Sequence, residues 1–257
     1  MATYAAPLPA AQLRERARLD RVFHTSAALA AALIVFVGFS PTFYLRDASQ
    51  PPISWLAVVH GLVFSAWMVA YVLQTALIAS RKRELHKTLG FVFTGLGAAM
   101  IVLGVKTALE AARRGAGGVQ DMDPRTFMVI PFFDLVLFAG FLWAGYHWRK
   151  SAEAHKRLML LATIDVIGPA IARMAMHASS PLFNQNFPMW AYAGMMLFIA
   201  VACVYDVATR RRPHQAYIWG ALVLTVSGPV RFTLGETPAW LSFDEARPVK
   251  LKNRAAR

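Results

Sequence analysis

The chain has 257 residues, of which 57% are hydrophobic and only 16% are charged. A soluble domain of this length usually carries about 25% charged residues, so this composition excludes an ordinary soluble protein. The formal net charge of +13 does not indicate nucleic-acid binding, because the positive charges lie at the ends of apolar segments rather than in one basic patch.

Seven apolar stretches follow one another along the chain. About 20 residues of helix cross a hydrocarbon layer of roughly 30 Å, and lipid cannot satisfy the backbone groups of an open segment. The stretches are 26–45, 53–79, 89–111, 127–148, 157–177, 189–208 and 216–235. The sequence therefore predicts an all-α, polytopic membrane helix bundle of seven transmembrane helices that occupies 26–236.

Two basic segments flank this predicted transmembrane domain. The leader, 1–25, has helical periodicity between residues 11 and 24, and it is either an amphipathic helix on the inner membrane surface or a solvated segment. The tail, 237–257, carries five positive residues, namely Arg247, Lys250, Lys252, Arg254 and Arg257. Seven spans place this tail opposite the leader, so either it is translocated or the last segment does not fully cross.

The Lys and Arg residues are divided unevenly between the two sets of loops. Fifteen lie before the first span, after the second, after the fourth and after the sixth, whereas the opposite loops hold four (Arg46, Arg113, Arg114 and Arg125). Cytoplasmic loops carry the excess of positive charge. We therefore predict a multi-pass protein of the bacterial inner (cytoplasmic) membrane with its N-terminus in the cytoplasm.

One short sequence step occurs twice. Residues 84–89 and 153–158 share Glu, His, Lys and Leu at the same offsets, and each step precedes a predicted outward-running helix. Parallel copies of one hairpin are commonly related by an axis along the membrane normal. The pattern predicts a central four-helix unit at 53–177 in which His86 and His155 face one another near the cytoplasmic surface. Chance, or ordinary interface chemistry, is the alternative.

The third span carries glycines seven residues apart. Gly90, Gly97 and Gly104 lie on one face, and small residues let membrane helices approach closely. This pattern predicts that the span at 89–111 is central in the bundle.

Polar residues inside the spans are candidates for function because they are costly in lipid. His60, Trp67, Tyr71 and Gln74 form one stripe on the second span, which must face protein or a cavity. The fourth and fifth spans carry a second group, made up of Asp134, Asp165 and Arg173.

The similar estimated depth of Asp134 and Arg173 predicts an ion pair between their spans. This pair either fixes the helix register or forms a site for an anionic ligand or a proton relay. Pro169 removes the helical hydrogen bond to the carbonyl of Asp165, which favours a role for Asp165 in ligand, ion or proton handling.

The histidines suggest a cofactor. Neutral imidazole is the commonest metal ligand, and paired histidines on facing helices can hold haem iron. An inner pair, His86 and His155, and an outer pair, His60 and His177, would allow two b-type haems across the membrane. The alternatives are helix-start, interfacial or hydrogen-bonded histidines. His24, His147 and His214 lie at span ends or in a loop, and we interpret them as surface residues.

The two His-containing steps also carry a resemblance. Residues 86–90 (His-Lys-Thr-Leu-Gly) and 155–159 (His-Lys-Arg-Leu-Met), with Arg173 downstream, resemble uncharacterised bacterial multi-pass membrane families that have His-Lys/Arg-x-Leu-Gly and His-Lys/Arg-x-x-Met steps. The histidine layout is loosely similar to the cytochrome b561 superfamily, where four helices hold two haems. That resemblance implies His60, His86, His155 and His177 as haem ligands.

Three functions fit these patterns. The first is an electron-transfer module with haem b, possible membrane oxidoreductase activity, and a membrane subunit or quinone as its partner. The second is a cofactor-free binding or transport protein for a small molecule or ion, with a cavity lined by His60, Asp134, Asp165 and Arg173. The third is a structural subunit of a membrane complex. All three require the lipid bilayer, and none involves nucleic acid.

Overall fold

The structure, a computed structural model, describes residues 9–115 and 123–242. Within these residues the chain is helical and contains no strand. Seven helices are long and apolar enough to cross a membrane, which confirms the predicted all-α fold with seven helices of spanning length. They are α1 (Ala10–Phe39), α2 (Trp55–Ala79), α3 (Arg83–Arg113), α4 (Pro124–His147), α5 (Ala152–Met176), α7 (Phe187–Arg210) and α8 (Gln215–Gly235). Three short elements complete the description: the π-helix η1 (Ser40–Tyr44), α6 (Pro181–Asn184) and α9 (Pro238–Ser242).

Local signals in the sequence set several helix ends. Ser54 begins α2, and its hydroxyl accepts a hydrogen bond from the backbone N–H of Ala57 at 3.2 Å. Asp123 caps α4 by accepting from the N–H of Arg125 at 2.8 Å, with a proline at the first helical position. Arg211 ends α7 in the left-handed region, at φ 66°.

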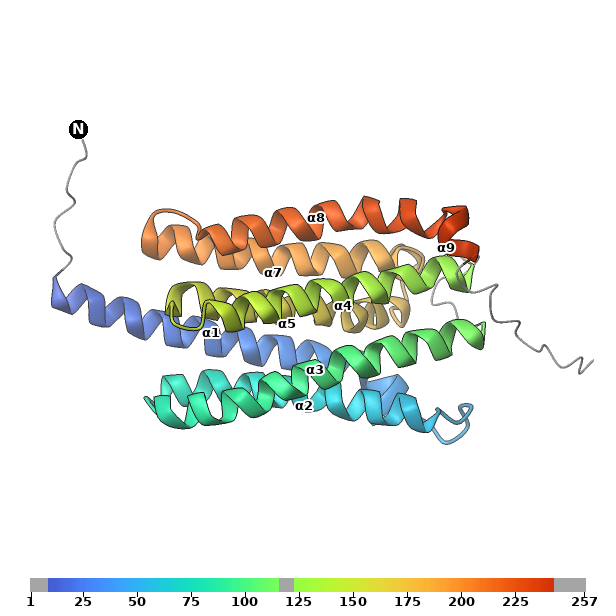
Figure 1. The fold of residues 1–257 in the computed structure, drawn as a ribbon, viewed down its shortest axis with the longest axis horizontal. Helices are drawn as coiled ribbons and strands as arrows, with labels where there is room; N and C mark the ends of the chain where they lie inside the picture. Colours follow the sequence, from blue (N-terminus) through green and yellow to red (C-terminus); the bar gives the residue numbers. More distant parts are fainter. Residues whose placement is uncertain (1–8, 116–122, 243–257) are drawn as a thin grey trace, which may run out of the picture.

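The long helices lie side by side, and α5 is at the centre of the bundle (Figure 1). Helices α1 to α4 each pack against the next helix in the chain, and α5 contacts α1, α4, α7 and α8. In its most apolar stretch, 61% of the residues of α5 are buried, against 17% for α3. The prediction that the span at 89–111 is central is therefore wrong.

The glycines of α3 serve one interface rather than a central position. A Cβ added at Gly97 or Gly104 would lie 2.5 Å from a side-chain carbon of Leu142 or Leu135, respectively. These two leucines of α4 are also seven residues apart. Each of them therefore packs onto one of the two glycines of the antiparallel helix α3. The spacing thus reports close packing of α3 on α4.

The basic leader is not a separate surface helix, contrary to one of the two expectations for it. From Ala10 it forms the first turns of α1, which continues without a break to Phe39. A helix of 30 residues is about 45 Å long, more than the hydrocarbon layer requires. Its first turns extend beyond the other helices (Figure 1). Residues 1–8 of the leader, and the tail from residue 243 onward, lie outside the described residues.

Helices α1 and α5 approach one another closely at Gly38. A Cβ built on Gly38 would collide with the backbone of Ala170, including its carbonyl oxygen. By contrast, a Cβ at Gly95 on α3 would meet nothing within 4 Å. Substituting each glycine by alanine therefore distinguishes two effects. At Gly38 the added methyl group disturbs helix packing, whereas at Gly95 it only removes the intrinsic cost of glycine in a helix.

We expect Gly38→Ala to lower the free energy of unfolding in detergent by about 1–3 kcal/mol, because the α1–α5 contact must open. The matched control, Gly95→Ala, should raise it by about 0.5–1 kcal/mol through reduced chain entropy. Thermal unfolding of both variants checks this. An equal effect at the two positions would contradict the close approach.

Candidate functional site

The predicted juxtaposition of His86 and His155 is present in the structure. His86 lies in the first turn of α3 and His155 in the first turn of α5. Their ring centroids are 6.1 Å apart, and the ring planes are nearly perpendicular, at 84°. The repeated step thus places one half-buried imidazole at the start of each of two parallel helices.

The protein holds the Nδ1 atom of each ring. The Nδ1 atom of His155 donates a hydrogen bond to the carbonyl oxygen of Gly145 at 2.8 Å. The Nδ1 atom of His86 lies against the side-chain amide of Gln74, which also contacts the backbone N–H of Gly90. Neither Nε2 atom has a hydrogen-bond partner in the described ranges. The two rings are therefore oriented by protein contacts at Nδ1.

The structure does not bring the outer pair together. His60 stacks on Phe64 of its own helix, with ring centroids 4.1 Å apart. His177 is exposed and follows the last residue of α5. Within the described residues, 9–115 and 123–242, no ring contact or hydrogen bond joins His60 to His177. The remainder of the His60 stripe faces protein as predicted, since Trp67 and Tyr71 are buried.

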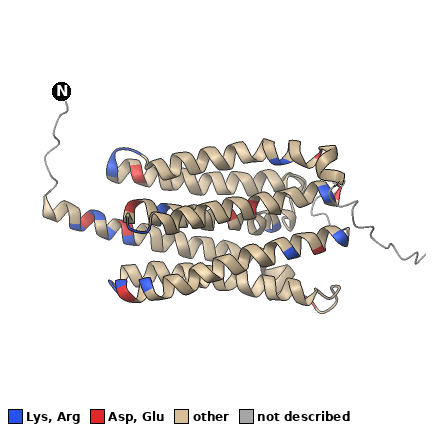
Figure 2. Cartoon of the chain, viewed as in Figure 1, with Lys and Arg blue, Asp and Glu red and all other residues tan. Residues whose placement is uncertain are grey.

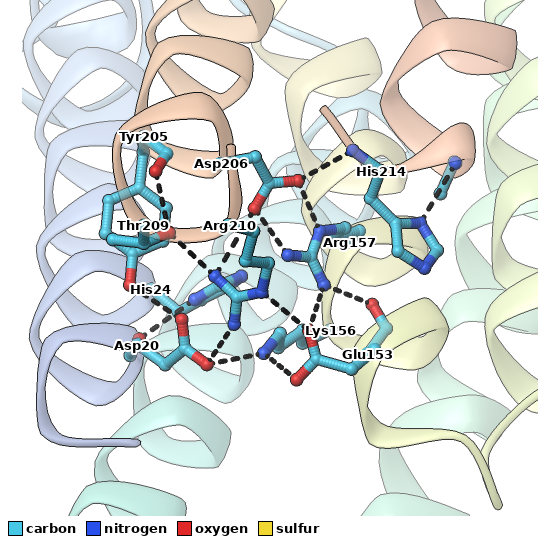
Figure 3. Close-up of polar contacts among 11 residues, drawn as sticks. Asp20, His24, Glu153, Lys156, Arg157, Tyr205, Asp206, Thr209, Arg210 and His214 are labelled. Carbon is cyan, nitrogen blue, oxygen red and sulfur yellow. Dashed lines mark hydrogen bonds and ion pairs between the residues drawn. The ribbon is translucent and has the colours of Figure 1, made fainter. Parts of the chain in front are cut away.

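A network of charged residues, which we call the inner ionic network, lies at the end of the bundle where α5 begins (Figure 3). Its centre is a buried ion pair between Arg157 of α5 and Asp206 of α7, with side-chain exposures of 0% and 1%. Arg157 Nε donates to Asp206 Oδ2 at 2.8 Å, and Arg157 Nη2 donates to Asp206 Oδ1. Arg157 Nη1 also donates to the Glu153 carboxylate at 2.8 Å.

Asp20 connects α1 to this network. Its carboxylate accepts from Lys156 at 2.8 Å, from Arg210 at 2.5 Å and from the Tyr205 hydroxyl at 2.6 Å. His24 lies one turn further along α1 and is 7% exposed, so its interpretation as a surface residue is wrong. It is buried because this part of the leader packs inside the bundle. His147, in contrast, is exposed as expected.

Sequence reasoning missed the inner ionic network. In the sequence, Arg157, Lys156 and Arg210 are recognisable only as positive charges of the inner loops, and no motif marks Asp20 or Asp206. The available signal was an acidic residue within an apolar helix close to a basic cluster. Asp206 has that pattern, but its partner is 49 positions away in the sequence.

A second polar group, the Asp–Arg cluster, consists of Asp134 on α4, Asp165 on α5, and Ser227 and Arg231 on α8. Arg231 Nη1 donates to Asp134 Oδ1 at 2.7 Å, and Arg231 Nη2 donates to the Ser227 hydroxyl at 3.0 Å. Asp165 is 1% exposed, and neither of its carboxyl oxygens has a hydrogen-bond partner among the described residues.

The predicted ion pair between Asp134 and Arg173 is wrong. Asp134 pairs instead with Arg231, which lies near the end of the last span. Arg173 instead donates to the carbonyl oxygen of Pro169 at 3.1 Å and lies over the ring of Phe39. The cation that pairs with Asp134 thus comes from α8 and not from α5.

Known proteins give no further guide to the site. No protein-family model, curated protein or solved structure matches the chain. In the part of the chain that the structure describes, no group of three or more His, Cys, Asp or Glu side chains could hold a metal ion.

Arg157→Met should destabilise the protein by about 3–5 kcal/mol, because it leaves the Asp206 carboxylate buried without its partner. The double variant Arg157→Met/Asp206→Leu should recover most of this loss. Thermal unfolding in detergent measures both. Lys87→Met is the matched control, since the Lys87–Glu84 pair is exposed and should contribute less than about 0.5 kcal/mol. A double variant as unstable as the single one would contradict a simple buried pair.

His214 should make stability sensitive to acid. It caps α8 by accepting from the N–H of Ala216 at 3.1 Å, and burial together with the nearby Arg157 lowers its pKa. As pH falls below about 6.5, His214 becomes protonated in the unfolded chain more readily than in the folded protein. The free energy of unfolding therefore decreases.

The variant His214→Asn keeps a good capping side chain but cannot titrate. It should therefore show a smaller loss of stability than the wild type between roughly pH 7.5 and pH 5, a range that includes the ordinary histidine pKa of about 6.5. Thermal unfolding across that range checks the difference. Parallel pH curves for the two proteins would exclude His214 as the source.

Proposed function

We propose that the protein is a membrane redox module that holds one b-type haem between His86 and His155. Its seven-helix architecture fits an integral, multi-pass membrane protein. The observation that carries the proposal is the facing imidazole pair, 6.1 Å between ring centroids. At this separation His86 and His155 would both be within reach of one iron atom.

The contacts behind the rings support the same assignment. Metal-binding histidines usually donate their other ring N–H to a carbonyl or similar acceptor, which fixes the ring and its tautomer. The carbonyl of Gly145 has this position for His155, whereas at His86 the side-chain amide of Gln74 donates to Nδ1 and orients the ring in that way. Haem bound there would supply one-electron transfer. The chain's own residues would orient the two ligands and set the polarity around them.

The location of the pair suits exchange with a partner. Both histidines lie in first helical turns at one end of the bundle, where a membrane subunit or a quinone can approach. This arrangement agrees with the resemblance to multi-pass families that have two His-containing steps. It departs from the two-haem layout of the cytochrome b561 superfamily, because His60 and His177 are not in contact. We therefore propose one haem.

We further propose that this end faces the cytoplasm of a bacterial cell and that the N-terminus is inside. Figure 2 shows many of the Lys and Arg residues at the end of the bundle where α3 and α5 begin. The positive-inside rule assigns such an end to the cytoplasmic side.

The absorption spectrum of protein purified in mild detergent tests the haem proposal. We expect a Soret band that shifts, and sharp α and β bands, when dithionite is added. His86→Ala and His155→Ala should each remove or broaden these bands, because each deletes one axial ligand. His147→Ala, at an exposed histidine, is the control and should leave the spectrum unchanged.

A featureless spectrum from protein expressed with ample haem supply would exclude the redox function. Ligand-dependent thermal stabilisation would then favour a binding or transport protein. A co-purifying membrane partner, without ligand effects, would favour a structural subunit.

A further inference from the structure

The Asp–Arg cluster contains a buried acid that the haem proposal does not use. Asp165 lies in α5, eight residues beyond Arg157 and eight before Arg173, which separates it from each by about 12 Å along the helix. Its side chain is 1% exposed. Neither carboxyl oxygen has a hydrogen-bond partner among the described residues, although the backbone of Phe138 in α4 lies beside it.

An ionised carboxylate in this place would have no compensating charge of its own. The charged groups that act on Asp165 from the packed helices are Asp134 of α4 and Arg231 of α8, and these two already form an ion pair with each other. Elsewhere around the middle of α5 the core consists of apolar side chains from α1 and α7, such as Ala31 and Ile199. Buried carboxyl groups without partners take up a proton rather than remain charged.

A proline lies close to each charged member of the cluster. Pro131 precedes Asp134 by three residues, Pro169 follows Asp165 by four, and Pro229 precedes Arg231 by two. Each proline lies inside its helix and removes the hydrogen bond to a carbonyl one turn earlier. For α5 that carbonyl belongs to Asp165 itself. Discontinuous backbone bonding of this kind is tolerated in membranes where it borders a polar site.

We propose that Asp165 is a proton-binding group inside the bundle, which takes up and releases a proton next to the fixed Asp134–Arg231 ion pair. The ion pair supplies a constant dipole, and the carbonyl freed by Pro169 supplies an acceptor beside the carboxyl group. Beside Pro169, the atoms nearest to a Cβ built on Gly168 belong to the flexible side chain of Met195. The proposal does not depend on haem.

Infrared spectroscopy of the full-length protein in lipid vesicles tests the inference. At neutral pH the wild type should show the C=O stretch of a protonated carboxylic acid. The band should shift within minutes in D2O, because the proton exchanges, and it should decrease reversibly as pH is raised. Asp165→Asn, which is nearly isosteric, should lack this band.

The controls separate a functional proton from other outcomes. Asp134→Asn should retain the band, and Asp165→Glu should move it while keeping its exchange, so the test remains available if the asparagine variant folds poorly. Absence of the band in the wild type, or its persistence in Asp165→Asn, would overturn the assignment. A band that neither exchanges in D2O nor responds to pH would show a static buried acid and would also overturn it. None of these results depends on the visible absorption spectrum.

Discussion

The buried ion pair between Arg157 and Asp206 constrains the whole inner end of the bundle. Separating these charges from water is costly, so each needs the other and the neighbours that complete their hydrogen bonds. Those neighbours come from α5 and α7, and the backbone N–H of His214, which precedes α8, also donates to Asp206 at 3.0 Å. Asp20 joins α1 to the same network through Lys156 and Arg210. Four helices are thereby fixed at one level. Because His155 is in the same turn of α5 as Arg157, the network also determines where its imidazole lies.

The two copies of the repeated step are not equivalent. At the offset of Arg157 the first copy has Thr88, whose hydroxyl donates only to a backbone carbonyl of its own helix. The Lys87–Glu84 pair beside it is largely exposed and adds little stability. The position of His155 is thus fixed by the buried ion pair in the same helical turn, whereas the orientation of the His86 ring depends on Gln74 of the neighbouring helix. A ligand bound by both rings would connect α5, which the inner ionic network holds in place, to α3, which that network does not include.

Hydropathy and charge were sufficient to predict seven helices, since apolar length is a local property of the sequence. The repeat also predicted that His86 faces His155, because like steps on parallel helices lie at the same depth. Contacts between distant helices were not predictable in this way. Asp134 had two cations at similar depth, Arg173 and Arg231, and only the packing of α8 on α4 selects between them. Likewise, the glycines of α3 indicated close packing but not its partner, and buried His24 depends on α1 continuing through the leader.

The central claim is that His86 and His155 together hold one haem iron, and electron paramagnetic resonance of the oxidised protein tests it most directly. If His86 and His155 held the iron with their ring planes nearly perpendicular, as they are here at 84°, the ferric protein would give a low-spin signal of unusually large anisotropy. The account predicts that signal at one iron per chain, and its loss in either single-histidine variant. A high-spin signal that neither variant changes, or no ferric haem signal from protein expressed with ample haem, would contradict the claim.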